Sequence, residues 1–153
     1  MRIALSSDER TELTDFLIRE LRERGHEVLL FGAIAENDPD VDWPLASSRA
    51  ARAVVNGEAD EAIVCCWTGT GASIAANKVR GIRAALCHDA ETARGARIWN
   101  HANVLALSLR ATSIPIAKEI LDAWFETPFS EDEWNLQQMA RIRALEAEFS
   151  SGE

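Results

Sequence analysis

The chain has 153 residues, 47% of them apolar, and a formal net charge of −9, which suits a single domain expected to span residues 1–153. The negative charge disfavours nonspecific binding to nucleic acid or acidic membrane surfaces, because phosphate contacts need clustered Lys and Arg. No long uncharged apolar run suggests a membrane span or signal peptide, so we expect a cytoplasmic protein.

Predicted strands and helices alternate along the chain. Leu13, Phe16, Leu17 and Leu21 recur at helical spacing after a short apolar run, and Gly25 follows as a helix terminator. The same patterns of apolar residues and turn residues along the chain predict strands at 2–6, 27–31, 61–66, 82–87 and 103–107. They predict helices at 10–24, 44–56, 72–78, 90–99 and 113–125. The alternation predicts an α/β fold, a three-layer αβα Rossmann-like sandwich with a five-stranded parallel sheet. Ligands of such sheets bind at the carboxyl ends of the strands.

A last helix is predicted at about 130–149. It carries apolar residues such as Trp134, Met139 and Phe149 among charged ones, and it follows the αβ core. Its apolar face packs either on its own core or on a second subunit, and the sequence alone favours neither.

The segment from Cys65 to Lys78 runs from a strand end through Thr68-Gly69-Thr70-Gly71 into a helix. Glycines let the backbone turn tightly and direct its N–H groups inward, and the helix that follows adds the positive end of its dipole. The segment therefore predicts a cradle for an anion or oxyanion. Its spacing fits neither the Walker nor the G-x-G-x-x-G nucleotide motif.

Cys66 stands immediately before this cradle, where nearby donors favour the thiolate form that can act as a base. A strand-end cysteine is more often a small buried hydrophobe than a catalyst, but the adjoining loop favours catalysis. Cys65 points to the opposite face of its strand and is expected to be structural. With three cysteines and no C-x-x-C pair, we expect reduced thiols and no metal site; adjacent cysteines also suit a disulfide poorly.

The chain resembles the ribose-5-phosphate isomerase B family, which includes the galactose-6-phosphate isomerase subunits. The likeness covers about residues 1–125. Its matching segments are Ser7-Asp8, Val41-Asp42-Trp43-Pro44, Gly57-Glu58-Ala59-Asp60, Thr68-Gly69-Thr70-Gly71, Ser73-Ile74-Ala75-Ala76-Asn77-Lys78, Gly81-Ile82-Arg83-Ala84-Ala85-Leu86 and Asn103-Val104-Leu105-Ala106-Leu107.

The resemblance implies an aldose–ketose isomerase, an intramolecular oxidoreductase that passes through a cis-enediolate and needs neither metal nor organic cofactor. It implies that Cys66 shuttles a proton between C1 and C2 and that Thr68 assists at the ring oxygen. It also implies a homodimer, with tetramers an open alternative, whose active site lies at the subunit interface. The substrate contacts expected from it and from the loop are Asp8, Glu9, Trp67, Gly69, Thr70, Gly71, Ser73, Trp99, Asn100, His101 and Arg110.

The sequence departs from the family pattern where the family binds phosphate and opens the sugar ring. Glu9 replaces a phosphate-binding histidine, Trp99 replaces the ring-opening histidine, and His101 replaces an aspartate. Trp134 and Gln138 stand where the family has two phosphate-binding arginines, and Arg110 keeps a third.

Arg141 and Arg143 would replace the two lost arginines only after a register shift, and their plainer interpretation is the solvated face of a helix.

These changes predict an isomerase that is not optimised for ribose 5-phosphate. A four-carbon ketose phosphate cannot close a furanose ring, so it would not need the missing histidine. An unphosphorylated sugar would not need the missing arginines. The competing hypothesis is a catalytically inactive sugar-binding or regulatory subunit of the same fold. Retention of Cys66 with the complete glycine loop favours the enzyme.

Overall fold

A computed structural model gives the structure of the protein and describes residues 1–150. The predicted domain of residues 1–153 thus ends in three residues, 151–153, that lie outside this description. The elements follow in the order β1 (Arg2–Ser7), α1 (Glu12–Glu23), β2 (Glu27–Gly32), α2 (Trp43–Val55), β3 (Glu61–Cys66), α3 (Thr70–Asn77), β4 (Ala84–Leu86), α4 (Ala90–Asn100), β5 (Val104–Ser108), α5 (Ile114–Glu126) and α6 (Glu133–Ser150).

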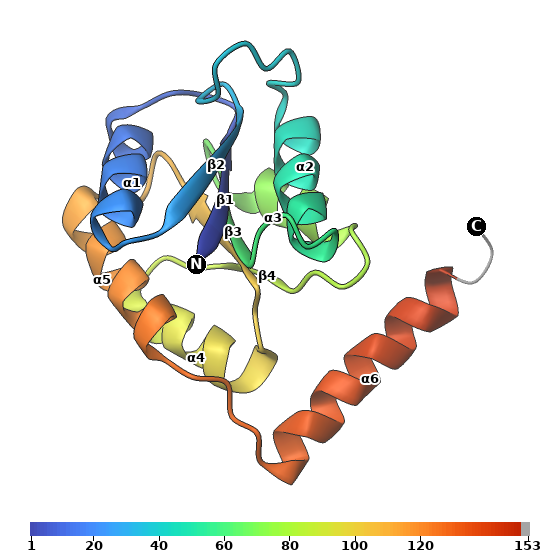
Figure 1. The fold of residues 1–153 in the computed structure, drawn as a ribbon. Helices are drawn as coiled ribbons and strands as arrows, with labels where there is room; N and C mark the ends of the chain where they lie inside the picture. The colour runs from blue at the N-terminus through green and yellow to red at the C-terminus, as the bar shows by residue number, and fades with distance from the viewer. Residues whose placement is uncertain (151–153) are drawn as a thin grey trace.

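The five strands form one parallel sheet in the order β2-β1-β3-β5-β4 (Figure 1). The predicted α/β fold is therefore confirmed. From β1 the chain crosses first to β2 on one side and then to β3 on the other, so the order reverses between β1 and β3. A crevice opens at such a reversal beyond the carboxyl ends of the two strands. Asp8 follows β1 and Cys66 ends β3, so both stand at this crevice.

Helices cover both faces of the sheet, and the two faces differ in the size of their side chains. Ile3, Leu5 and Cys65 pack with α1, α4 and α5 in a core of large residues that includes Trp124. The alternate residues Ala4 and Cys66 face α2 and α3, in a core rich in alanine. Because successive side chains of a strand point to opposite faces, Cys65 and Cys66 are separated as the sequence predicts.

The strand predicted at 82–87 is shorter in the structure, where β4 comprises only Ala84–Leu86. At its start the Arg83 N–H donates to the side-chain oxygen of Asn103, at 2.8 Å. The amide of Asn77 bonds both the N–H and the carbonyl of Ala84 on the outer edge of the sheet. Side chains thus take backbone hydrogen bonds that further strand pairing would have used.

A buried ion pair joins the start of β3 to α4 and α5. The Arg97 guanidinium donates to Glu61 at 2.5 Å, and the indole N–H of Trp124 donates to the other Glu61 oxygen at 3.1 Å. The same guanidinium lies over the rings of Trp124 and Phe129, 4.7 and 4.6 Å from their centroids. Phe129 belongs to the turn before α6, so this cluster also fixes the point from which α6 departs.

The last helix lies outside the sheet and its covering helices (Figure 1), and near its end the Glu146 carboxylate accepts a hydrogen bond from the Gly81 N–H at 3.1 Å. Only Asn135 and Met139 of α6 are buried, whereas its exposed large apolar side chains are Trp134, Leu136, Ile142, Leu145 and Phe149. Among residues 1–150, no helix has the length and apolar character needed to cross a membrane.

Glu61→Ala should lower the free energy of unfolding by about 3–5 kcal/mol, because the buried Arg97 charge loses its carboxylate partner. Glu91→Ala is the control, since it removes an exposed pair with Arg94 and should cost about 0–1 kcal/mol. Urea denaturation of both variants measures the difference. Equal losses would show that the buried pair does not stabilise the fold.

Candidate active site

A pocket of about 260 Å³ opens at the carboxyl edge of the sheet, at the crevice between β1 and β3. Its lining comes from the end of β1, the start of α2, the end of β3 and the start of α3. The lining residues are Asp8, Trp43, Cys66, Trp67, Thr68, Thr70 and Gly71. The structure thus brings together Asp8 with most of the predicted residues of the glycine loop.

Cys66 lies at the base of this pocket with 5% of its surface exposed. Its sulfur accepts a hydrogen bond from the Ala72 N–H, in the first turn of α3, at 3.4 Å. An N–H donor and the positive end of a helix dipole both interact favourably with negative charge. Cys65 and Cys87 lie in the opposite core, where burial raises the pKa of both thiols, that of Cys87 to about 12. Of the three cysteines, Cys66 alone lines the pocket.

The glycine loop makes a compact turn between β3 and α3. Gly69 has a φ of +78°, and a Cβ there would lie 2.6 Å from a methyl of Leu86 and 2.9 Å from the Leu107 carbonyl carbon. Glycine is therefore required by both conformation and space. Within residues 1–150 no acceptor receives the N–H groups of Gly69, Thr70 or Gly71. These donors, with the Thr68 and Thr70 hydroxyls 2.8 Å apart, can hold developing negative charge.

The helix of the glycine loop begins earlier than predicted, at Thr70 instead of residue 72, because Gly69 in its left-handed conformation is the N-cap. Ser73 is therefore the fourth residue of α3, and its N–H donates to the Gly69 carbonyl at 3.0 Å. Ser73 is half-buried on α3 and does not line the pocket.

Trp43 also lines the pocket, although it is not among the substrate contacts predicted from the sequence. Three atoms of its indole lie 2.9–3.2 Å from the position that a Cβ on Gly71 would take. The ring therefore rests directly on the glycine loop. A signal was present in Asp42-Trp43-Pro44, because Asp at the N-cap and Pro in the first turn start α2 at this edge of the sheet.

Backbone bonds from the segment after β5 hold Cys66 and Trp67 in place. The Leu109 N–H donates to the Cys66 carbonyl at 2.9 Å, and the Arg110 N–H donates to the Trp67 carbonyl at 3.0 Å. The Ser108 hydroxyl also donates to the Trp67 carbonyl, at 3.0 Å. Arg110 is exposed and does not line the pocket, but its backbone places it at the same edge.

Asp8 is the one charged side chain of the pocket lining. Burial raises the pKa of its carboxyl group, and the negative charges of Glu9 and Asp42 raise it further. One carboxyl oxygen is buried without a hydrogen-bond partner. Such an acceptor is suited to a hydroxyl donor of a sugar. Glu9 itself is exposed and does not line the pocket.

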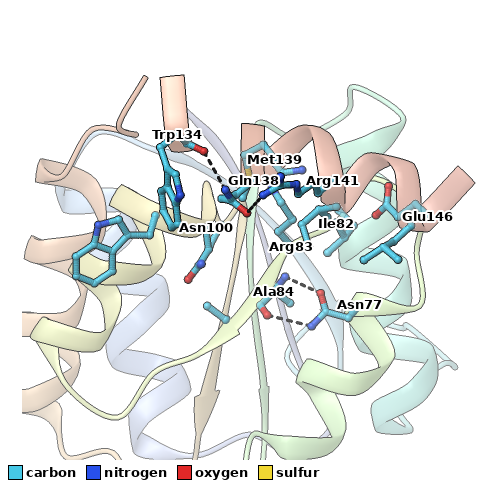
Figure 2. A pocket seen from close by; sticks show the side chains of 15 residues that line it. Asn77, Ile82, Arg83, Ala84, Asn100, Trp134, Gln138, Met139, Arg141 and Glu146 are labelled. Carbon is cyan, nitrogen blue, oxygen red and sulfur yellow. Dashed lines mark hydrogen bonds between the residues drawn. The ribbon is translucent and has the colours of Figure 1, made fainter. Parts of the chain in front are cut away.

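Trp99, Asn100 and His101 lie at the other end of the sheet, where α4 ends and β5 begins. Trp99 and Asn100 line a larger cavity, of about 650 Å³, between the core and α6 (Figure 2). Trp134, Gln138 and Arg141 line it from α6. Within one chain these residues are therefore separated from Cys66 by the length of the central strands.

His101 is engaged within the chain's own fold. Its ring stacks on Phe129 with centroids 4.5 Å apart, and its Nε2 lies 2.7 Å from the Ser130 carbonyl oxygen. Contact with a substrate would require the ring to leave these partners. Arg141 bonds Gln138 on α6 at 3.1 Å, and Arg143 lines a separate small cavity with Arg80 and Arg83. In residues 1–150 no three His, Cys, Asp or Glu side chains gather as metal ligands would.

Comparisons with known proteins identify similar sequences and structures. The profile of a family described as Ribose/Galactose Isomerase matches residues 3–144. Ribose-5-phosphate isomerase B of Escherichia coli is 39% identical over 130 residues, covering 85% of each chain. D-erythrulose-4-phosphate isomerase of Pectobacterium atrosepticum is 45% identical over 91 residues, covering 60% of this chain and 57% of the relative. The structure of ribose-5-phosphate isomerase B from Clostridium thermocellum matches with a TM-score of 0.89 and 37% identity, covering 97% of this chain and 99% of that one.

Gly69→Ala should destabilise the fold by more than Gly25→Ala does. Both glycines have positive φ, at +78° and +89°, so both substitutions carry the backbone cost of roughly 1–2 kcal/mol. Only at Gly69 would the new methyl meet other atoms, which adds about 1–3 kcal/mol of overpacking. Chemical denaturation of the two variants measures this difference. Equal destabilisation of the two variants would mean that Gly69 does not approach Leu107 of β5 closely enough to exclude a methyl group.

Proposed function

Because the chain belongs to the ribose/galactose isomerase family, we propose that it interconverts the aldose and ketose forms of a small sugar phosphate with Cys66 as the base. The family resemblance and the isomerase class predicted from the sequence are both confirmed. The observation that carries the assignment of the base is the position of the Cys66 sulfur, in a pocket under a glycine loop and bonded to the Ala72 N–H.

The proposed reaction moves one proton between neighbouring carbons. The Cys66 thiolate removes a proton from C1 of the ketose, and the electrons of that C–H bond form the C1–C2 double bond of a cis-enediolate. The electrons of the C2 carbonyl double bond move to O2 as the enediolate forms. The thiol then returns the proton to C2, while the proton on O1 is transferred to O2, so that O1 becomes the aldehyde oxygen and O2 a hydroxyl. The alcohol at C1 is oxidised as the ketone at C2 is reduced, so the step balances within the substrate.

The loop stabilises the charge that this step creates. The free N–H groups of Gly69, Thr70 and Gly71 are available to the enediolate oxygens. Thr68 and Thr70, whose hydroxyls are hydrogen-bonded, can pass the proton between O1 and O2. Asp8 accepts hydrogen bonds from substrate hydroxyls. Trp67 contacts the carbon chain, and Glu9, Ser73 and Arg110 lie around this centre.

The pocket lacks a group that opens a sugar ring. Among residues 1–150, its lining contains no imidazole, since His88 is exposed after β4 and His101 is engaged at the other end of the sheet. Substrates that exist in open-chain form avoid this requirement. The D-erythrulose-4-phosphate isomerase relative, named for a four-carbon substrate, supports the same substrate class.

The wild type should incorporate deuterium from heavy water into C1 or C2 of D-erythrulose 4-phosphate, as followed by NMR. Ribose 5-phosphate should react at least tenfold more slowly. Cys66→Ala should abolish the exchange, because no other side chain of the pocket supplies a thiolate. Cys65→Ala is the control and should retain it, because Cys65 faces the opposite core.

Two results would contradict this assignment. Exchange that persists in Cys66→Ala would remove Cys66 from the role of base. A wild type that binds sugar phosphates without any exchange would instead support an inactive sugar-binding or regulatory subunit.

We infer further that two copies assemble so that the cavity beside α6 of one copy meets the Cys66 pocket of the other. The cavity beside α6 holds Trp99 and Asn100, which cannot reach Cys66 of their own chain. The exposed apolar residues of α6 need a covering surface, and the exposed Leu45 of α2 and Ile74 of α3 offer one beside the Cys66 pocket. In this arrangement the chain forms one domain whose α6 packs on the partner copy. The three free thiols suit the reducing environment of the cytoplasm, where we expect the protein to work.

Sedimentation at micromolar concentration should give about twice the 16.9 kDa mass of the chain. Leu136→Glu with Leu145→Glu should shift the protein toward the monomer, because both exposed leucines would place carboxylates in the interface. The circular dichroism of the double variant checks that the helices remain. A wild type that sediments as a monomer at this concentration would refute the assembly.

A further inference from the structure

Trp67 is held at the mouth of the Cys66 pocket although 55% of its surface is exposed. Its carbonyl accepts from the Ser108 hydroxyl and the Arg110 N–H, both at 3.0 Å, so its backbone is fixed from the β5 side. A large aromatic side chain gains free energy when it is buried, and exposure forgoes that gain. The fold therefore presents this indole to solvent at a place where a ligand can cover it.

Trp43 provides the second indole of the pocket. It rests on Gly71 and is 42% exposed, so one part of the ring packs on the loop and another part stays open. The polar groups of the lining are the two threonine hydroxyls and the Asp8 carboxyl, and no lysine or arginine side chain belongs to it. The pocket thus offers apolar walls and hydroxyl-binding groups, which suit the carbon chain of a sugar and leave a phosphate outside.

The pocket is small, which suits a short ligand. Its volume of about 260 Å³ lies below the roughly 300–1,000 Å³ of ordinary small-molecule sites. The reacting carbons have to reach the Cys66 sulfur, which is nearly buried, and the exposed Trp67 indole lines the same pocket where the rest of the carbon chain can contact it. Arg110, whose backbone N–H bonds the Trp67 carbonyl, is an exposed cationic residue beside Trp67 at this edge of the sheet.

We propose that Trp67, together with Trp43, sets the chain length of the substrate and selects four-carbon over five-carbon ketose phosphates. This inference rests on the proposed isomerase function and adds a residue that determines specificity. The indole of Trp67 packs on the C–H face of a short chain and lets its phosphate reach the rim. A longer chain carries one more hydroxymethylene group, which has to lie where the indole stands.

The test compares kcat/KM on D-erythrulose 4-phosphate and D-ribulose 5-phosphate for the wild type, Trp67→Ala and Trp67→Phe. The wild type should prefer the four-carbon substrate, and Trp67→Ala should shift this preference toward the five-carbon substrate by about tenfold or more, because apolar pocket contacts discriminate on this scale. Trp67→Phe should shift it less. Val55→Ala is the control, since it removes an exposed apolar side chain at the far end of α2 and should leave the preference unchanged.

The ratio of the two substrates does not depend on the fraction of active protein, so partial misfolding of a variant cannot produce the shift. An unchanged ratio in an active Trp67→Ala protein would overturn the role of Trp67 and leave the isomerase intact. A wild type that prefers the five-carbon substrate would do the same. A wild type without deuterium exchange on either substrate would overturn the proposed function, and this inference with it.

Discussion

The close approach of Gly69 to β5 is the contact on which the site depends. A side chain at this position would collide with the Leu107 carbonyl carbon and with Leu86, so the loop lies where only glycine permits it. This position starts α3 directly after the turn and brings the Ala72 N–H to the Cys66 sulfur. The Cys66 sulfur and the N–H groups of the glycine loop are therefore placed by one backbone conformation, before any substrate binds, as preorganised catalysis would require.

The charge distribution is consistent with the proposal that two copies share the site. The chain carries a net charge of −9, and the Cys66 pocket adds a carboxyl group whose pKa is raised by burial. An anionic substrate therefore needs cations from outside the pocket lining. Arg110 stands at the same edge of the sheet, whereas Arg141 lies with Trp99 and Asn100 beside α6. The proposed assembly of two copies would bring the residues beside α6 of one copy to the Cys66 pocket of the other.

The structural features around the candidate site that the sequence predicted are local along the chain. The glycine spacing located the turn between β3 and α3, and the alternation of a strand assigned Cys65 and Cys66 to opposite faces. The contact of Trp43 with Gly71 joins residues 28 positions apart, and no sequence period encodes it. The stacking of His101 on Phe129 likewise depends on where the turn before α6 meets α4. Such tertiary contacts decide which candidates share a pocket.

The central claim, that the Cys66 thiolate acts on C1 and C2 under the glycine loop, is tested most directly by a crystal structure with a three-carbon hydroxamate phosphate, whose nitrogen takes the place of C1 of a four-carbon ketose phosphate. The hydroxamate mimics the planar enediolate. The account predicts its two oxygens within hydrogen-bond distance of the N–H groups of Gly69 to Gly71, and the sulfur about 3–3.5 Å from its carbon. A hydroxamate group bound away from Cys66, for example in the cavity beside α6, would contradict the account.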